Sequence, residues 1–120
     1  YHGRNHMETL NTPNITDNKW HHITWTRKGD KNCIYVDGAN KQCKTMNNTS
    51  TPLSIADNGL YLEQDQDSLG GGFDKNQDLE GLMDEVKVYN YALTDSAVSD
   101  IYNNEKSGKN YDGSARTCQE

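Results

Sequence analysis

The sequence predicts an all-β fold, an antiparallel sandwich with one short helix near its end. Two observations support this expectation. Segments rich in β-branched and aromatic residues recur between turn residues, at intervals of roughly 8–12 residues, as in sandwiches built from short strands. The dipeptide Asp37-Gly38 lies between two such segments, and both of its residues tolerate the positive φ that a tight hairpin turn requires.

Six segments are expected to form strands. The most strongly patterned is Trp20–Arg27, where alternation puts Ile23 and Trp25 on one face, which we expect to point inward. The other five are short and are bounded by turn residues: Cys33–Val36, Ala39–Lys44, Leu53–Ala56, Leu60–Gln64 and Leu82–Tyr91.

A short helix is expected after the last strand. Thr94 is a favourable N-cap for a helix of about Asp95–Asn103, and Asp95 lies in its first turn, where the helix dipole favours an acid. We interpret residues 1–104 as a partial domain whose N-terminal strands are missing. Residues 105–120 are expected to form a polar C-terminal tail.

Composition argues against two kinds of partner. The net charge is −6 and no basic stripe is visible, which argues against nucleic acid. No apolar run reaches the roughly 18 residues that span a bilayer, so membrane insertion is not expected. The acidic residues concentrate between Glu63 and Glu85, either as a solvated acidic face or as ligands for a hard cation.

The chain has three cysteines. Cys33 and Cys43 flank the Asp37-Gly38 turn and are placed to face each other across a hairpin, so we expect them to form a disulfide. A disulfide implies an oxidising compartment and therefore a secreted or surface location. Cys118 is left over, which suggests either a cysteine partner outside this chain or a free thiol.

One segment concentrates oxygen donors. Asp65–Asp78 combines carboxylates and side-chain amides with three consecutive glycines, at positions 70–72, which allow sharp bends of the backbone. Calcium takes about six to eight oxygen ligands, and this segment has the residue types to supply them. Its spacing is not that of an EF-hand loop, and an ordinary solvated acidic loop is the alternative.

Four segments resemble a known family. Asp65–Gln77 reads Asp-Gln-Asp-Ser-Leu-Gly-Gly-Gly-Phe-Asp-Lys-Asn-Gln. It resembles the pentraxin signature Glu-Gln-Asp-Ser-Phe-Gly-Gly-x-Phe-Glu-x-x-Gln, which supplies calcium ligands. Trp20–Trp25 and Ile34–Gly38 resemble paired strands of laminin-G-like domains, and Gly81–Leu93 resembles the segment before their closing helix. The resemblance implies the concanavalin A-like jelly roll of these families.

The resemblance also implies a set of calcium ligands. By position they are Asp65, Gln66 through its backbone carbonyl, Asp67, Asp74 and Gln77. Two of the carboxylates, those of Asp65 and Asp74, stand where the family has the longer Glu. The family's other ligands come from an earlier strand, and no matching pair is evident in this sequence.

The function implied is binding, not catalysis. The resemblance points to a secreted or cell-surface adhesion module that recognises carbohydrate or an extracellular protein with the help of Ca²⁺. A narrower resemblance connects Ile101–Gly113 and Cys118 to laminin-G-like domains of bacterial surface proteins, such as the Q protein of the mannose-sensitive haemagglutinin pilus system.

Two alternatives remain open. The domain is an adhesive spacer if its calcium ion is purely structural. It is a glycoside hydrolase of the β-glucanase type if Glu63, Asp65 and Asp67 line one face of a strand, where alternate residues share a face. The third position of that pattern is Asp where the enzymes have Glu, and the intervening residues are Gln, so we favour a binding module.

Overall fold

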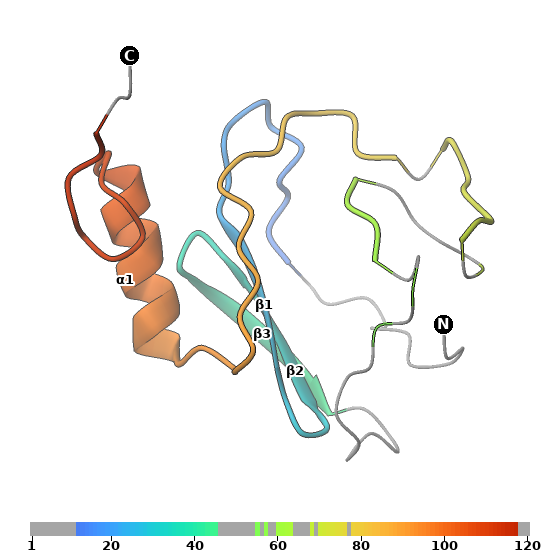
Figure 1. Ribbon diagram of the computed structural model, residues 1–120, viewed down its shortest axis with the longest axis horizontal. Coiled ribbons are helices and arrows are strands. Elements are labelled where there is room, and N and C mark those ends of the chain that lie inside the picture. Colours follow the sequence, from blue (N-terminus) through green and yellow to red (C-terminus); the bar gives the residue numbers. More distant parts are fainter. Residues whose placement is uncertain are drawn as a thin grey trace. The chain divides into compact units, whose positions relative to one another are not determined.

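The computed structural model describes residues 12–45, 55, 57, 60–63, 68, 70–76 and 78–117. The chain divides into two compact units. One contains the glycine-rich loop, within residues 51–88, and the other contains residues 7–50 and 89–120. The second unit holds a three-stranded sheet and one helix (Figure 1). The prediction of a β fold with one short helix near the end is therefore confirmed.

The sheet is antiparallel with strand order β1-β2-β3. The strands are β1 (Ile23–Lys28), β2 (Lys31–Val36) and β3 (Ala39–Thr45). Asp37 and Gly38 connect β2 to β3 with φ values of 55° and 71°, as the predicted tight turn requires. The register then shifts between Ile34 and Val36.

The register shift brings the two cysteines opposite each other. Cys33 pairs with Cys43 across β2 and β3, and the structure joins their sulfur atoms in a disulfide. Asn40, at the shift, has a φ of 32°. A local irregularity of this kind places one extra residue on one strand of an antiparallel pair.

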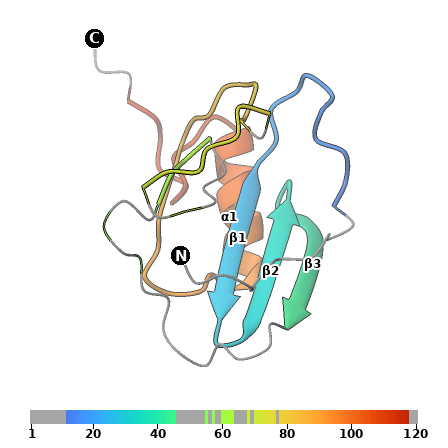
Figure 2. The ribbon, with the colours of Figure 1, turned by 90° about the vertical axis from the view of Figure 1, so that its right-hand side faces the viewer.

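Helix α1 (Asp95–Lys106) covers one face of this sheet (Figure 2). Val98 of the helix is fully buried against Cys33 and Tyr35 of β2, which are 5% and 3% exposed, and Leu93 packs against the same cluster. Burying apolar area of this kind is the main favourable term in folding. The core of this unit therefore lies between β2 and α1.

The ends of the helix are stabilised by hydrogen bonds. The Ala97 amide donates to Oγ1 of Thr94 (3.2 Å), so the predicted N-cap is confirmed. The helix continues to Lys106 and so crosses the expected boundary between residues 104 and 105. The side-chain amide of Asn104 donates to the Tyr111 carbonyl (3.0 Å), which ties the following turn to the helix. Among the described residues, no helix is long and apolar enough to cross a membrane.

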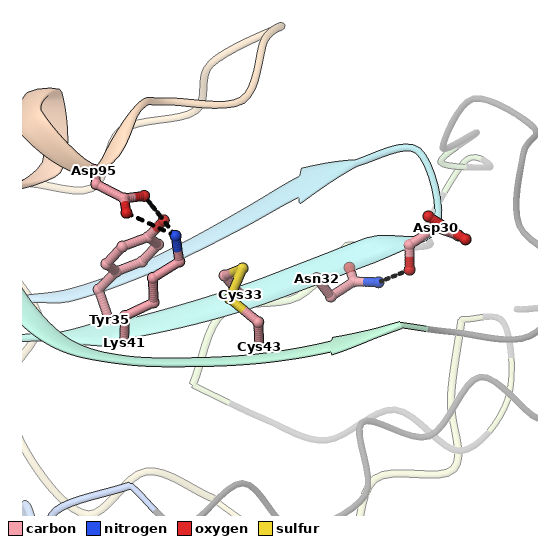
Figure 3. The surroundings of a disulfide bond; sticks show 7 residues. All are labelled: Asp30, Asn32, Cys33, Tyr35, Lys41, Cys43 and Asp95. Carbon is pink, nitrogen blue, oxygen red and sulfur yellow. Dashed lines mark hydrogen bonds and ion pairs between the residues drawn. A yellow bond between two sulfur atoms is a disulfide. The ribbon is translucent and has the colours of Figure 1, made fainter.

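A polar contact joins the first turn of α1 to the sheet (Figure 3). The Tyr35 hydroxyl donates to Oδ1 of Asp95 (2.8 Å), and Nζ of Lys41 lies 2.7 Å from both carboxylate oxygens. The hydrogen bonds from Lys41 and Tyr35 lower the pKa of Asp95, and the one to Asp95 raises the pKa of Lys41. Asp95 thus interacts favourably with the helix dipole and also connects the helix to two strands.

The prediction that Ile23 and Trp25 of β1 point inward is wrong for the core that β2 and α1 form. Ile23 and Trp25 are 45% and 54% exposed. The register explains this result, because the residues of β1 opposite Tyr35 and Cys33 are Thr24 and Thr26. Paired residues share a face, and α1 covers the face of Tyr35 and Cys33. The alternating pattern was correct, but the helix lies on its polar side.

Two other predicted strands are not formed in the described part of the chain. Residues 60–63 and 78–94 contain no strand. Glu63 and Glu85 have φ values of 69° and 54°, which interrupt an extended backbone, and Leu82 and Val88 are 81% and 82% exposed. Of the segment Leu53–Ala56, only Ile55 lies within the described residues.

We expect the Gly38→Ala variant to be much less stable than Gly29→Ala. Both glycines have positive φ, but a Cβ at Gly38 would lie 2.7 Å from Cβ and Cδ1 of Tyr102, whereas one at Gly29 meets nothing within 4 Å. The left-handed backbone costs each variant about 1 kcal/mol, and the overlap adds about 1–3 kcal/mol for Gly38 alone. Urea unfolding measures both, and equal losses would contradict the contact with Tyr102.

The double variant Cys33→Ala/Cys43→Ala is expected to lose about 2–3 kcal/mol of unfolding free energy. The two cysteines are 10 residues apart, and closing a loop of that length removes entropy from the unfolded chain. Denaturant unfolding with and without reductant checks this. Reductant should destabilise the wild type and leave the double variant unchanged; a wild type insensitive to complete reduction contradicts the prediction.

Candidate functional site

The acidic, glycine-rich loop closes on itself at two places. The Leu79 amide donates to the carbonyl of Glu63 (2.8 Å), which brings the two ends of the loop together. Nearer its tip, Ser68 and Gly71 exchange backbone hydrogen bonds of 3.2 and 2.9 Å. All the ligands implied by the family resemblance lie in sequence between Glu63 and Leu79, and hence on this one closed loop.

Glycine and aromatic residues give the loop its local geometry. Gly70 and Gly72 both have a φ of 74°, a conformation that glycine adopts without strain, as the glycine run predicts. The rings of Tyr61 and Phe73 meet edge to face with centroids 4.8 Å apart. Such a pair is worth about 0.5–1.5 kcal/mol beyond its buried area, and here it connects the start of the loop to its second half.

Asp74 is the predicted ligand that the structure describes. Its side chain is half-buried. Oδ1 accepts hydrogen bonds from the backbone amide and the side-chain amide of Asn76, both at 2.9 Å. These two bonds orient the carboxylate through Oδ1, and neither of them uses Oδ2. An oriented carboxylate with one oxygen outside its own turn is suited to bind a cation.

Asp78 is a donor that the ligand set from the resemblance does not include. Its Oδ1 is buried and has no hydrogen-bond partner among the described residues. Burying a carboxylate oxygen without a partner costs free energy unless a proton, a water molecule or a cation compensates it. Its position directly after Gln77 is shared with no special motif, so the sequence does not distinguish it from the other acids of the loop.

The other predicted ligands, Asp65, Gln66, Asp67 and Gln77, lie outside the described residues. Within the part of the chain that the structure describes, no group of three or more His, Cys, Asp or Glu side chains is arranged to hold a metal ion. A site built from the described residues alone is therefore incomplete.

The hydrolase alternative depends on an extended strand through Glu63. That residue instead has a φ of 69°, and its carbonyl accepts the hydrogen bond that closes the loop. Asp65 and Asp67 lie outside the described residues. At Glu63 the backbone therefore lacks the alternating geometry that would align three carboxylates on one face.

Several curated proteins are similar to this chain. C-reactive protein 1.1 of Limulus polyphemus is 35% identical over 96 residues, which are 77% of this chain and 39% of that protein. Human neuronal pentraxin-1 is 37% identical over 90 residues, 72% of this chain and 20% of that protein. A rat protein with sushi, von Willebrand factor type A, EGF and pentraxin domains is 30% identical over 98 residues, which are 76% of this chain and 3% of that protein. The chain therefore spans less than half the length of each of these relatives.

A solved structure has a similar fold. An S-layer domain-containing protein from Clostridium thermocellum superposes with a TM-score of 0.56 at 24% identity, over 74% of this chain and 42% of that one. At this identity the likeness concerns the fold alone. The narrower resemblance to a pilus protein stays a prediction.

The family itself is shown by a match that covers most of the chain. Residues 2–99 match the laminin-G profile described as the concanavalin A-like lectin/glucanases superfamily. The pentraxin relatives, the antiparallel sheet and the glycine-rich loop agree with it. This chain belongs to the concanavalin A-like lectin/glucanase superfamily, and its relatives within it include pentraxins.

Proposed function

We propose that this chain is part of a secreted or cell-surface binding module in which the loop between Glu63 and Leu79 holds one calcium ion. The observation that carries the proposal is the pair of carboxylates within this closed loop. Asp74 is oriented through its Oδ1, and the buried Oδ1 of Asp78 has no hydrogen-bond partner within the part of the chain that the structure describes. Both are the hard oxygen donors that calcium prefers.

Charge supports the same proposal. Asp65, Asp67, Asp74 and Asp78 are four acids within 14 residues of chain that is closed by the hydrogen bond between Glu63 and Leu79. Gathering several carboxylates is unfavourable unless their charge is compensated, and a divalent cation does so for all of them at once. The ligands we assign are Asp65, Gln66, Asp67, Asp74 and Gln77, to which we add Asp78.

The ion has two possible uses. In the first, it coordinates a hydroxyl or phosphate oxygen of an extracellular ligand, a carbohydrate or a protein, as lectin-like relatives suggest. In the second, it only orders the loop of an adhesive spacer. We favour the first, because the glycines of the loop carry no side chains that would shield an ion from an incoming ligand.

Location and domain organisation are proposed on related grounds. The Cys33–Cys43 disulfide supports an oxidising, extracellular compartment. We propose that residues 1–104 are part of a larger sandwich, and the exposed apolar side chains of Ile23 and Trp25 agree with a face that further strands would cover. Cys118 would be available to a cysteine outside this chain.

Calorimetric titration with CaCl₂ is expected to show one binding event that a chelator abolishes. Extracellular calcium modules bind at about 10⁻⁴–10⁻³ M, and a concentration of about 100 times the dissociation constant raises the unfolding free energy by about 2.7 kcal/mol. Thermal unfolding in calcium and in chelator provides the second measurement. No heat of binding and no shift in Tm would refute the proposed site.

The variants Asp74→Asn and Asp78→Asn are expected to weaken calcium binding by about tenfold or more, since substitutions near a metal commonly cost at least that much. Asp100→Asn is the matched control, because it makes the same charge change on the exposed side of α1. Titration of all three with calcium measures the effect. If Asp100→Asn lost as much calcium affinity as the loop variants, the effect would come from net charge and not from lost ligands.

The variant Asp67→Ala separates the two uses of the ion. Binding to an array of immobilised glycans in calcium and in chelator is measured beside the Tm. A loss of both glycan binding and calcium-dependent stability is expected. If the wild type binds no glycan in either buffer and Asp67→Ala loses only its calcium-dependent stability, the result favours the spacer.

A further inference from the structure

His21 lies between two carboxylates at the point where the chain enters the sheet. Its Nε2 is 2.9 Å from Oδ1 of Asp17, and its Nδ1 is 2.9 Å from Oδ2 of Asp37. The ring is largely buried, with 16% of the side chain exposed, and the carboxylates are about one-third exposed. One imidazole thus connects the segment before β1 to the turn between β2 and β3.

The two short contacts decide the protonation state. A neutral imidazole has one N–H donor and one lone pair, whereas an ionised carboxylate only accepts. Both contacts are hydrogen bonds only if the ring carries protons on both nitrogens. In a neutral ring one nitrogen would face a carboxylate oxygen lone pair to lone pair, and that contact would be repulsive.

The Asp37 end of the bridge is held firmly. Its Oδ1 accepts from the backbone amide of His22 (3.0 Å), and its own amide donates to the carbonyl of His22 (2.9 Å). Partial burial raises the pKa of Asp37, but hydrogen bonds from His21 and His22 and the charges of His21 and Lys106 outweigh it, so the pKa is lowered. The carboxylate is therefore ionised and oriented at neutral pH.

The bridge also touches the helix through the turn. Gly38 follows Asp37 and lies against the ring of Tyr102, whose hydroxyl accepts a hydrogen bond from Lys106 (3.1 Å). Oε2 of Glu105 is 3.6 Å from Nε2 of His22, the residue next to His21. The charged and titratable groups around the bridge come from the entry segment, the turn and α1; they are Asp17, Lys19, His22, Asp37, Glu105 and Lys106.

The pKa values follow from this geometry. Hydrogen bonds to Asp17 and then Asp37 raise the pKa of His21 above its ordinary 6.5, against a smaller effect of burial. The hydrogen bonds from His21 and Lys19 lower the pKa of Asp17 to about 2. Because the His21 pKa is raised by folding, its contribution to stability is complete below pH 6.5 and is lost as the pH rises through the folded value.

We propose that His21 is a pH-dependent latch that holds the segment Asp17–His21 to the Asp37-Gly38 turn while its ring is protonated on both nitrogens. Loss of one proton replaces one hydrogen bond with a repulsive contact and releases residues 17–21 from the turn, whereas the two hydrogen bonds between Asp37 and the backbone of His22 remain. The residues of the latch lie outside the acidic glycine-rich loop in the sequence, so the proposal does not rest on the calcium site.

An NMR titration of the full chain tests the latch. The ring signal of His21, assigned by its loss in His21→Gln, is expected to titrate above 6.5. Backbone amide signals of residues 17–22 and 37–38 should change with the same midpoint. A His21 midpoint at or below pH 6.5 would overturn the proposal, and so would backbone amide signals that do not change with the same midpoint.

Two variants make the test specific. Asp17→Asn preserves the shape of the carboxylate but removes its charge, and is expected to return the His21 midpoint toward 6.5. Asp100→Asn removes a charge from the exposed side of α1 and should leave the midpoint unchanged. Equal shifts in both variants would show a general charge effect and reject the latch. Because Asp17 is on the surface, its variant should fold even where a change at Asp37 does not.

Discussion

The left-handed backbone at Asp37 and Gly38 is the constraint on which the sheet and helix depend. It reverses the chain in two residues, so that β3 returns directly beside β2. It allows the ring of Tyr102 to approach a backbone that carries no Cβ. It also turns the carboxylate of Asp37 toward the entry segment. Strand pairing, helix packing and the polar bridge therefore share one turn.

Local features were predictable from the sequence, and features set by distant pairing were not. The Asp37-Gly38 turn and the Thr94 cap depend on a few neighbouring residues, so the types of these residues were sufficient to predict both. Alternation along β1 identified two faces, but only the register with β2 decides which one meets the helix. Leu82–Tyr91 has the composition of a strand, yet a strand also needs a partner, and positive φ at Glu85 interrupts it.

The candidate site shows the same division. The resemblance assigned Asp74 a role by its position in a motif, and the structure adds how Asn76 orients it. Asp78 could not be selected in this way, because neither its residue type nor its spacing distinguishes it from the neighbouring acids. Only its buried, unpartnered oxygen does so, and burial depends on the folding of the whole loop.

The irregularity at Asn40 has a consequence for the disulfide. If β3 continued the pairing of Val36 with Ala39 without an extra residue, Cys33 would stand opposite Gln42, and the sulfur of Cys43 would emerge on the other side of the sheet. A single inserted residue thus determines whether the two thiols can meet at all. The covalent cross-link of this hairpin depends as much on a count of residues as on the presence of two cysteines.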